Sequence, residues 1–158
     1  MFLRTVGAGY DVPDPGYHPS LPRMLAVDFG ERRIGIAVSE GRVAVPLTIV
    51  EHENRAGDVE RVAAIVRDQG VSLVVLGLPL LFSGEEGTQA RRTRRFGSAL
   101  SRLIQIPVAY QDERLSSVDA EQAASEHRPG RRHARRHIDD RAAAMILQAY
   151  IDAGPVTS

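Results

Sequence analysis

Residues 24–40 read MLAVDFGERRIGIAVSE, two apolar runs separated by a short polar turn. Residues 24–27 form a short apolar run that ends at Asp28, and a second apolar run occupies residues 34–39 after a turn that contains Gly30. Two such runs joined by a short glycine-containing turn are typical of paired β-strands. Asp28 therefore stands where a buried strand ends, a position from which a side chain reaches a site instead of the core.

The chain after this stretch predicts a mixed sheet with helices. Residues 43–50 read as a third strand, and the short links between the three strands favour an antiparallel meander. Beyond it the apolar period becomes helical up to Gly70, which is typical of a C-terminal helix stop. The next predicted elements are a strand at 73–76 bounded by Gly77, a basic helix from about Thr88 to Leu103, and a strand at 106–110. A helix capped by Ser116 or Ser117 follows, and it contains Val118, Glu121 and Ala124. The last predicted helix runs from about Asp139 to Asp152. The predicted fold class is α/β, a mixed five-stranded sheet with three antiparallel strands followed by parallel strands, flanked by helices.

Length and composition predict a single globular domain in the cytoplasm. The chain has 158 residues, of which 43% are hydrophobic and 25% are charged, and it lacks the roughly 18 consecutive apolar residues of a membrane span. It contains no cysteine, which excludes disulfides and thiolate zinc sites. Residues 1–22 are rich in glycine and proline, so we interpret them as a flexible extension, or as the result of a start codon assigned upstream of Met24. The domain itself is expected to span residues 23–158.

Three carboxylates stand where an apolar element ends or begins: Asp28, Glu113 and Asp139. Carboxylates that converge on one point provide the hard oxygen ligands that Mg²⁺ or Mn²⁺ prefers. Each residue alone also has an ordinary interpretation. Asp28 could form a turn, Glu113 could pair with Arg114, and Asp139 could cap a helix, with Asp140 as an equally good neighbour.

The net charge is zero, but the basic residues are clustered. All 20 are arginine, and half of them fall in two segments that no acidic residue interrupts: Arg91, Arg92, Arg94, Arg95 and Arg102, and then Arg128, Arg131, Arg132, Arg135 and Arg136. Arginine suits bidentate contact with phosphate. The pattern predicts nucleic-acid binding through Arg92, Arg95, Arg128, Arg131, Arg132, Arg135 and Arg136. For the first segment, a solvated helix face is an equally good interpretation. The second is expected to be a basic loop that contains glycine and proline.

Four ordered motifs resemble the YqgF/RuvX family of bacterial RNase H-fold nucleases. They are Val27-Asp28-Phe29-Gly30 with Ile34-Gly35-Ile36-Ala37-Val38, Gly77-Leu78-Pro79-Leu80, Asp112-Glu113-Arg114-Leu115-Ser116, and Ile138-Asp139 with Ala142-Ala143 and Ile146-Leu147-Gln148. The resemblance spans Met24 to about Ile151. One departure is that Leu81 and Ser83 stand where the family commonly has Asn and then Asp or Asn.

The resemblance implies a metal-dependent endonuclease that hydrolyses phosphodiester bonds of structured nucleic acid. Asp28, Glu113 and Asp139 would be both the catalytic residues and the ligands of Mg²⁺ or Mn²⁺, with two ions roughly 4 Å apart. The family is associated with maturation of the 5′ end of 16S rRNA and with resolution of four-way DNA junctions. Symmetric cutting of a junction would call for a homodimer.

Two other classes of protein share features with this chain. The first strand also resembles the phosphate-binding start of the sugar kinase and actin superfamily, but those enzymes close two lobes around ATP and this domain is too short for both. The other alternative is a non-catalytic nucleic-acid-binding or transcription-associated module of the same fold. Retention of Asp28, Glu113 and Asp139 favours the nuclease.

Overall fold

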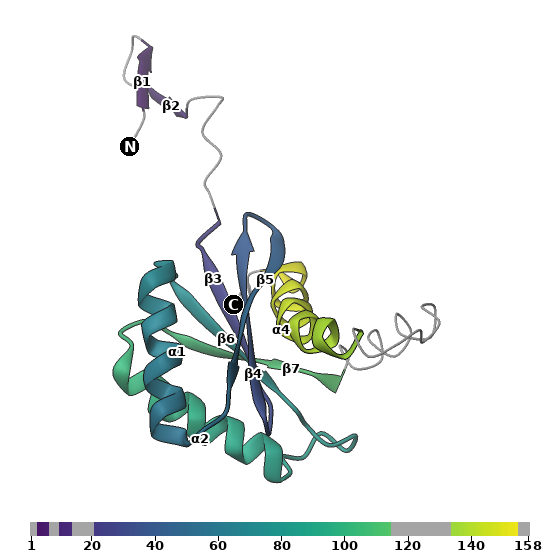
Figure 1. Cartoon of the computed structure of the whole chain (residues 1–158). Coiled ribbons are helices and arrows are strands. Elements are labelled where there is room, and N and C mark those ends of the chain that lie inside the picture. Colours follow the sequence, from purple (N-terminus) through teal and green to yellow (C-terminus); the bar gives the residue numbers. More distant parts are fainter. Residues whose placement is uncertain (1–2, 7–9, 14–20, 115–133, 155–158) are drawn as a thin grey trace.

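The computed structural model describes residues 3–6, 10–13, 21–114 and 134–154, with side chains for residues 21–114 and 141–154. Its centre is a five-stranded sheet with the strand order β5-β4-β3-β6-β7 (Figure 1). The strands are β3 (Met24–Phe29), β4 (Arg33–Glu40), β5 (Val43–Glu51), β6 (Leu73–Leu78) and β7 (Val108–Asp112). A separate two-stranded sheet pairs β1 (Leu3–Val6) with β2 (Tyr10–Pro13).

The predicted mixed sheet is confirmed. Strands β3, β4 and β5 pair antiparallel, whereas β6 pairs parallel with β3 and β7 pairs parallel with β6. Strand β3 is therefore central, and Val27 lies opposite Leu76 of β6. The parallel strands β3, β6 and β7 bring their carboxyl ends to the same edge of the sheet.

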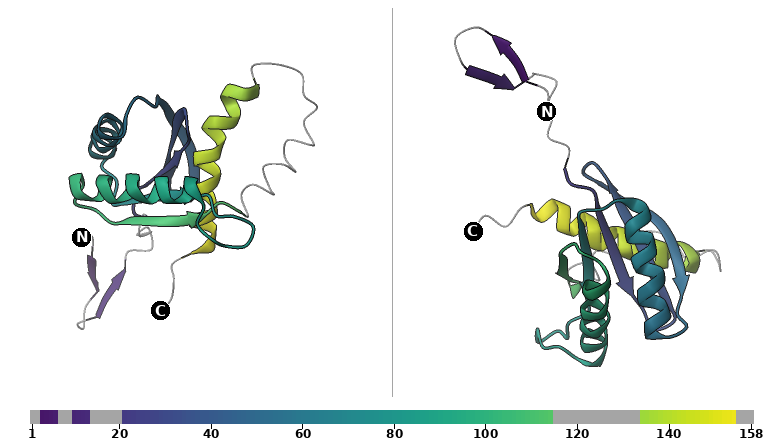
Figure 2. Two further views of the ribbon diagram at one scale, coloured as in Figure 1. Left: turned by 90° about the horizontal axis from the view of Figure 1, so that it is seen from below. Right: turned by 90° about the vertical axis from the view of Figure 1, so that its left-hand side faces the viewer.

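Two layers of helices cover the sheet. Helices α1 (Arg55–Gln69) and α2 (Thr88–Leu103) lie on one face, and α4 (Ala134–Ala153) crosses the other (Figure 2). Side chains of β3 alternate between the two faces, as expected for a strand. Leu25, Val27 and Phe29 belong to the larger apolar cluster beneath α1 and α2. Met24 and Ala26 belong to the smaller cluster beneath α4.

The helix boundaries follow local chemistry. The side chain of Asn54 accepts a hydrogen bond from the Gly57 amide (2.8 Å) and so caps α1 at its start. Gly70 ends the helix in the left-handed conformation at φ 58°, which favours glycine. Among the described residues, no helix is both long and apolar enough to cross a membrane.

Several predicted boundaries are wrong. Strand β6 does not end before Gly77 but continues through Leu78, and β7 begins at Val108 instead of Ile106. The last helix begins at Ala134, so Asp139 lies inside it and does not open it. Alanine and arginine are strong helix formers, which explains the earlier start. The helix predicted after Ser116 or Ser117 lies outside the described residues. In the extension, residues 3–6 and 10–13 form strands that were not predicted.

Candidate active site

Asp28 lies at the carboxyl end of the central strand, on the α4 face of the sheet. It follows Met24 and Ala26 in the strand alternation, and both of those residues are buried beneath α4. Its backbone is opposite Gly35 of β4. The Asp28 side chain is half-buried. The sheet thus presents this carboxylate at its edge, where it is accessible but partly shielded from water.

Glu113 reaches the same place from beyond the end of β7. Its amide donates a hydrogen bond to the Leu78 carbonyl at the end of β6 (3.1 Å), which fixes the chain as it leaves the sheet. Burial, the charge of Asp28, a hydrogen bond with the Asp28 side chain and the charge of Asp112 together raise the pKa of Glu113 to about 7. Asp28 and Glu113 therefore form a carboxylate pair.

Gly77 makes room for this pair. A Cβ atom at Gly77 would lie 2.2 Å from Glu113 Oε1 and 2.4 Å from Ile146 Cδ1 of α4. Any side chain here would push either the carboxylate or the helix away, since such distances are far below van der Waals contact. Sequence reasoning missed this role, because a glycine after an apolar run is usually a strand end or a turn.

Asp112 is adjacent to Glu113 in sequence but has a different environment. Arg114 donates to both of its carboxylate oxygens, from Nε at 2.9 Å and from Nη2 at 2.6 Å to Oδ2. These bonds lower the pKa of Asp112. The arginine that could have formed a surface pair with Glu113 is therefore engaged by Asp112.

The position of Asp139 on α4 is compatible with the same site. Residues 143 and 146 of this helix are buried in the cluster beneath α4, and Ile146 reaches the space above Gly77. Positions four and seven residues apart share one face of an α-helix. Residue 139 thus belongs to the helix face that packs on the sheet. Its side chain lies outside the described part of the structure, so the predicted third carboxylate remains a prediction.

The arginines predicted to bind nucleic acid have different surroundings. Arg92 is half-buried, with its guanidinium carbon 6.0 Å from the centre of the Phe29 ring, whereas Arg95 is exposed. Their neighbours Arg91 and Arg94 connect α2 to the residues around it. Arg94 pairs with Glu86 and lies 4.7 Å above the Tyr110 ring, and Arg91 donates to the Glu86 carbonyl (3.0 Å).

The second arginine segment is largely outside the described residues. Arg128, Arg131 and Arg132 lie there. Arg135 and Arg136 belong to the first turns of α4, so the prediction that they form part of a loop is wrong. Their side chains are not described, and their contact with nucleic acid remains a prediction.

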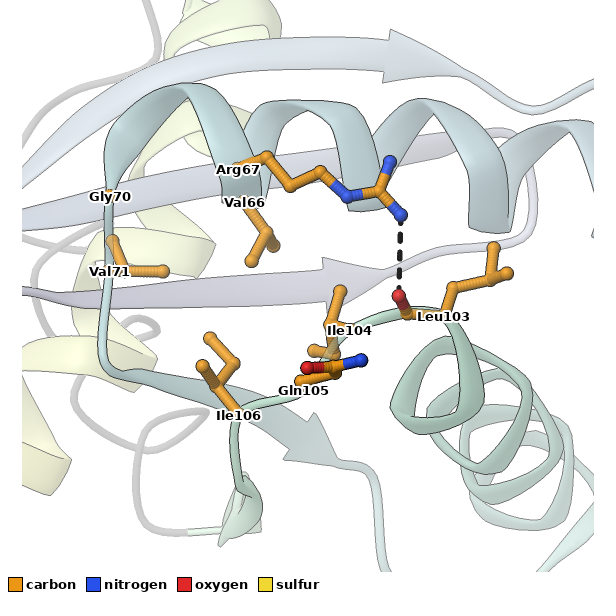
Figure 3. A pocket seen from close by; sticks show the side chains of 8 residues that line it. All are labelled: Val66, Arg67, Gly70, Val71, Leu103, Ile104, Gln105 and Ile106. Carbon is orange, nitrogen blue, oxygen red and sulfur yellow. Dashed lines mark hydrogen bonds between the residues drawn. The ribbon is translucent and has the colours of Figure 1, made fainter.

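An open pocket with a volume of about 490 Å³ lies at the opposite end of the sheet (Figure 3). It is formed where α1 and α2 end, and Val66, Gly70, Ile104 and Ile106 are among its lining residues. A hydrogen bond from Arg67 to the Leu103 carbonyl (3.3 Å) crosses between the two helices there. Gly70 precedes the start of β6, whereas the carboxylate pair lies at its end. The pocket is therefore separate from the acidic site.

The donor set at the sheet edge fits a hard divalent cation. Two carboxylates in contact repel each other when both are ionised, and a bound cation relieves this repulsion. In the part of the chain with described side chains, no group of three or more acidic or histidine residues could hold a metal. Asp28 and Glu113, two of the three predicted ligands, meet here, and residue 139, the position of the third, lies on α4.

The sheet order and the paired carboxylates define the class of protein: an RNase H-like fold with an acidic site at the carboxyl ends of its parallel strands. A solved structure described as "T. thermophilus RuvC in complex with Holliday junction substrate" has the same fold, with a TM-score of 0.53 at 15% identity. The likeness covers 84% of this chain and 95% of that one. At this identity it is informative about the fold alone.

Residues 22–153 match the family described as "RuvX: Holliday junction resolvase". Relatives from Anaeromyxobacter sp. and Chloroflexus aurantiacus are 41% and 42% identical over 132 residues. Each match covers 82% of this chain, and the two matches cover 96% and 86% of the relatives, both of which are named "Putative pre-16S rRNA nuclease". The chain belongs to the RuvX family, as its motifs predicted, and by family it is a nuclease.

Proposed function

We propose that this protein is a divalent-metal-dependent endonuclease that processes the 5′ end of pre-16S rRNA. The observation that carries the proposal is the contact between Asp28 and Glu113 above Gly77, with the pKa of Glu113 raised to about 7. A strongly perturbed carboxyl beside a second carboxyl is typical of catalytic and metal-binding sites. A purely structural role would not require two half-buried carboxylates in contact.

Asp28 and Glu113 would hold Mg²⁺ or Mn²⁺, with Asp139 of α4 as the third ligand. When bound, two such ions would supply an activated water and would neutralise charge on the phosphate and on the leaving oxygen. The protein's own contribution is position. Strand β3 holds Asp28, the bond from the Glu113 amide to Leu78 holds Glu113, and α4 would hold the third position. No nucleophilic side chain is required for this chemistry.

The arginines would hold the phosphate backbone on either side of the cut. Arg95 is exposed on α2, and Arg92 lies beside Phe29, the residue that follows Asp28. Arg128, Arg131, Arg132, Arg135 and Arg136 would add contacts from the segment that leads into α4. Each phosphate neutralised on a duplex steepens the salt dependence of binding by a slope of roughly 0.9.

The names of the relatives favour pre-16S rRNA as the substrate, and with this substrate the reaction would take place in the cytoplasm. The family description favours a second candidate, the four-way DNA junction. The same acidic site could serve both substrates. Symmetric resolution of a junction would require a homodimer with two active sites, whereas trimming one RNA end would not.

A cleavage assay with two labelled substrates tests the proposal. One substrate is an RNA that carries the 16S 5′ leader, and the other is a four-way DNA junction, each incubated with Mg²⁺ or Mn²⁺. We expect the wild type to cleave the RNA at its leader. We expect Asp28→Asn to abolish this cleavage while leaving RNA binding intact, because the change removes a ligand charge and not an arginine.

Asp68→Asn is the matched control, because Asp68 is an exposed carboxylate on α1. We expect this variant to cleave the RNA like the wild type. Preferential cleavage of the junction would move the proposal to the second substrate. Full cleavage by Asp28→Asn, or an indifference of cleavage to divalent ions, would exclude the metal-dependent site. Tight binding without cleavage by the wild type would favour the non-catalytic module.

A further inference from the structure

Phe82 is completely exposed, at 100% of its accessible surface. Among the described residues, the next most exposed large hydrophobic side chains are Val43 at 59% and Leu81 at 51%. Single exposed apolar residues are common on protein surfaces and need no function. The case for Phe82 therefore depends on how its loop is held and on where the loop lies.

The loop that carries Phe82 is closed by its own hydrogen bonds. The Leu81 amide donates to the Glu85 carbonyl (2.9 Å), and the Gly84 amide donates back to the Leu81 carbonyl (2.8 Å). Gly84 has φ 88°, a conformation that favours glycine. The Leu81 side chain lies against Gly87, within 3.2 Å of where a Cβ would be. Leu81 thus packs on Gly87 and holds the loop in place, while the Phe82 side chain points into solvent from the hydrogen-bonded turn.

The same loop is attached to the carboxylate site. The Arg114 guanidinium lies 3.3 Å from where a Cβ of Gly84 would be, and Arg114 is itself held by Asp112. Phe82 follows Leu78, the residue that binds the Glu113 amide, by four positions. Four residues span at most about 14 Å. This upper bound on the separation of the Leu78 and Phe82 Cα atoms equals the length of about four stacked nucleotides at roughly 3.4 Å each.

The surroundings of Phe82 favour a nucleobase over a protein surface. Docking of a protein usually uses a contiguous apolar patch of several hundred Å², but the neighbours that follow Leu81 and Phe82 are polar or charged: Ser83, Glu85 and Glu86. The charge of Glu86 is paired with Arg94. Helix α2, which carries this and other arginines, follows the loop in sequence. Arginines contact two other residues of this loop: Arg114 lies at Gly84, and Arg94 pairs with Glu86. An exposed aromatic on a loop held by arginines is suited to stacking on single-stranded bases.

We propose that Phe82 stacks on an unpaired base of the substrate, within about four nucleotides of the cleaved bond. Bases inside a duplex are covered on both faces, so only an unpaired base or a helix end offers a face to the ring. Phe82 would then direct cleavage to places where a duplex meets an unpaired strand. This inference rests on the proposed nuclease function and adds a specificity determinant to it.

The test measures stacking and cleavage separately. The RNA carries 2-aminopurine at single unpaired positions around the cleavage site, and its fluorescence is followed on binding without divalent ions. A fully paired RNA of equal length serves as the second substrate. The proteins are the wild type, Phe82→Ala, Phe82→Trp and Leu103→Ala. Leu103 is 43% exposed at the far end of α2 and is the matched control.

We expect the wild type to quench one or two adjacent positions, and Phe82→Ala to lose that quenching. Affinity for the RNA with unpaired bases should fall about 5- to 150-fold in Phe82→Ala, the effect of one aromatic–base stack. Affinity for the paired RNA should not change. Phe82→Trp should restore both quenching and affinity, and Leu103→Ala should behave like the wild type.

Three outcomes would overturn the proposal: quenching that survives Phe82→Ala, an equal loss of affinity for both RNAs, or a failure of Trp to substitute for Phe. A change in self-association instead of RNA binding would assign Phe82 to a protein contact. Because quenching is read without cleavage, a wild type that cleaves nothing would refute the nuclease function while leaving the stacking result decisive.

Discussion

At Gly77 the absence of a side chain allows two carboxylates to meet. Gly77→Ala would place a methyl group 2.2 Å from Glu113 Oε1 and 2.4 Å from Ile146 Cδ1. We expect the variant to lose about 1–3 kcal/mol of stability through overpacking. We also expect cleavage to fall by at least about tenfold, since displacement of a metal ligand by as little as 1 Å has large effects on rate. Chemical denaturation and the cleavage assay measure the two effects.

Gly97→Ala is the control for this prediction at the residue scale. Its methyl group would lie 2.3 Å from the Tyr110 hydroxyl and 2.6 Å from Leu76 Cδ1, on the opposite face of the sheet. The loss of stability should be similar, but the carboxylate pair is not touched. If both variants lose cleavage to the same extent while folded, Gly77 has no special relation to Glu113.

At the scale of elements, the parts of the fold with regular periodicity could be predicted from sequence. The alternation in β3 and the helical spacing of α1 up to Gly70 depend only on local residues, and the bounds of α2 follow from its flanking glycine-rich loop. The start of α4 could not be predicted from apolar periodicity, because residues 134–137 contain no apolar residue other than alanine; only their helix propensity indicates it. The role of Gly77 could not be predicted either, since it is set by residues distant in sequence.

Helix α4 is attached to the edge of the sheet through Gln148. Its Oε1 accepts from the amide of Ala44 in β5 (2.9 Å), and its Nε2 donates to the carbonyl of Arg42 in the turn before β5 (3.0 Å). We expect Gln148→Ala to cost about 1–2 kcal/mol, the effect of losing partly buried hydrogen bonds. Cleavage should also fall, because α4 carries Asp139. Urea denaturation gives the stability change.

Asp152→Ala is the matched variant for the helix. Asp152 is exposed and accepts from the same Gln148 amide (3.0 Å), but it makes this bond within α4 and not to the sheet. Its loss should change stability by less than about 0.5 kcal/mol. Equal effects of the two substitutions would show that the bonds across to the sheet do not hold the helix.

At the scale of the whole molecule, the acidic groups act on stability in opposite directions as pH changes. Burial alone would raise the pKa of Asp58, but bonds from the Glu53 amide, His52 and Arg61 lower it overall. Arg114 lowers the pKa of Asp112. Both aspartates stabilise the fold above their ordinary pKa of 3.8, and this contribution is lost as pH falls through their lower folded values. Glu113 behaves in the opposite way.

The pKa of Glu113 rises from 4.5 to about 7 in the folded state. Its contribution is therefore fully present below pH 4.5 and is lost as pH rises through about 7, when the fold must hold two adjacent negative charges. Glu113→Gln keeps the shape and removes the titration. We expect its midpoint temperature of unfolding to equal that of the wild type near pH 4.5 and to exceed it at pH 8, in calorimetry without divalent ions.

Saturating Mg²⁺ at pH 8 should remove the difference in midpoint temperature between the wild type and Glu113→Gln. The wild type is stabilised because a cation bound only by the folded state adds to its stability. The same addition at pH 4.5 should have little effect, since the protonated carboxyl is a poor ligand. Glu113→Gln should respond weakly at both pH values. If the midpoint temperatures of the two proteins changed with pH in parallel, the pKa of Glu113 would be the same in the folded and unfolded states. A Mg²⁺ response that is equal in both would place the ion elsewhere in the molecule.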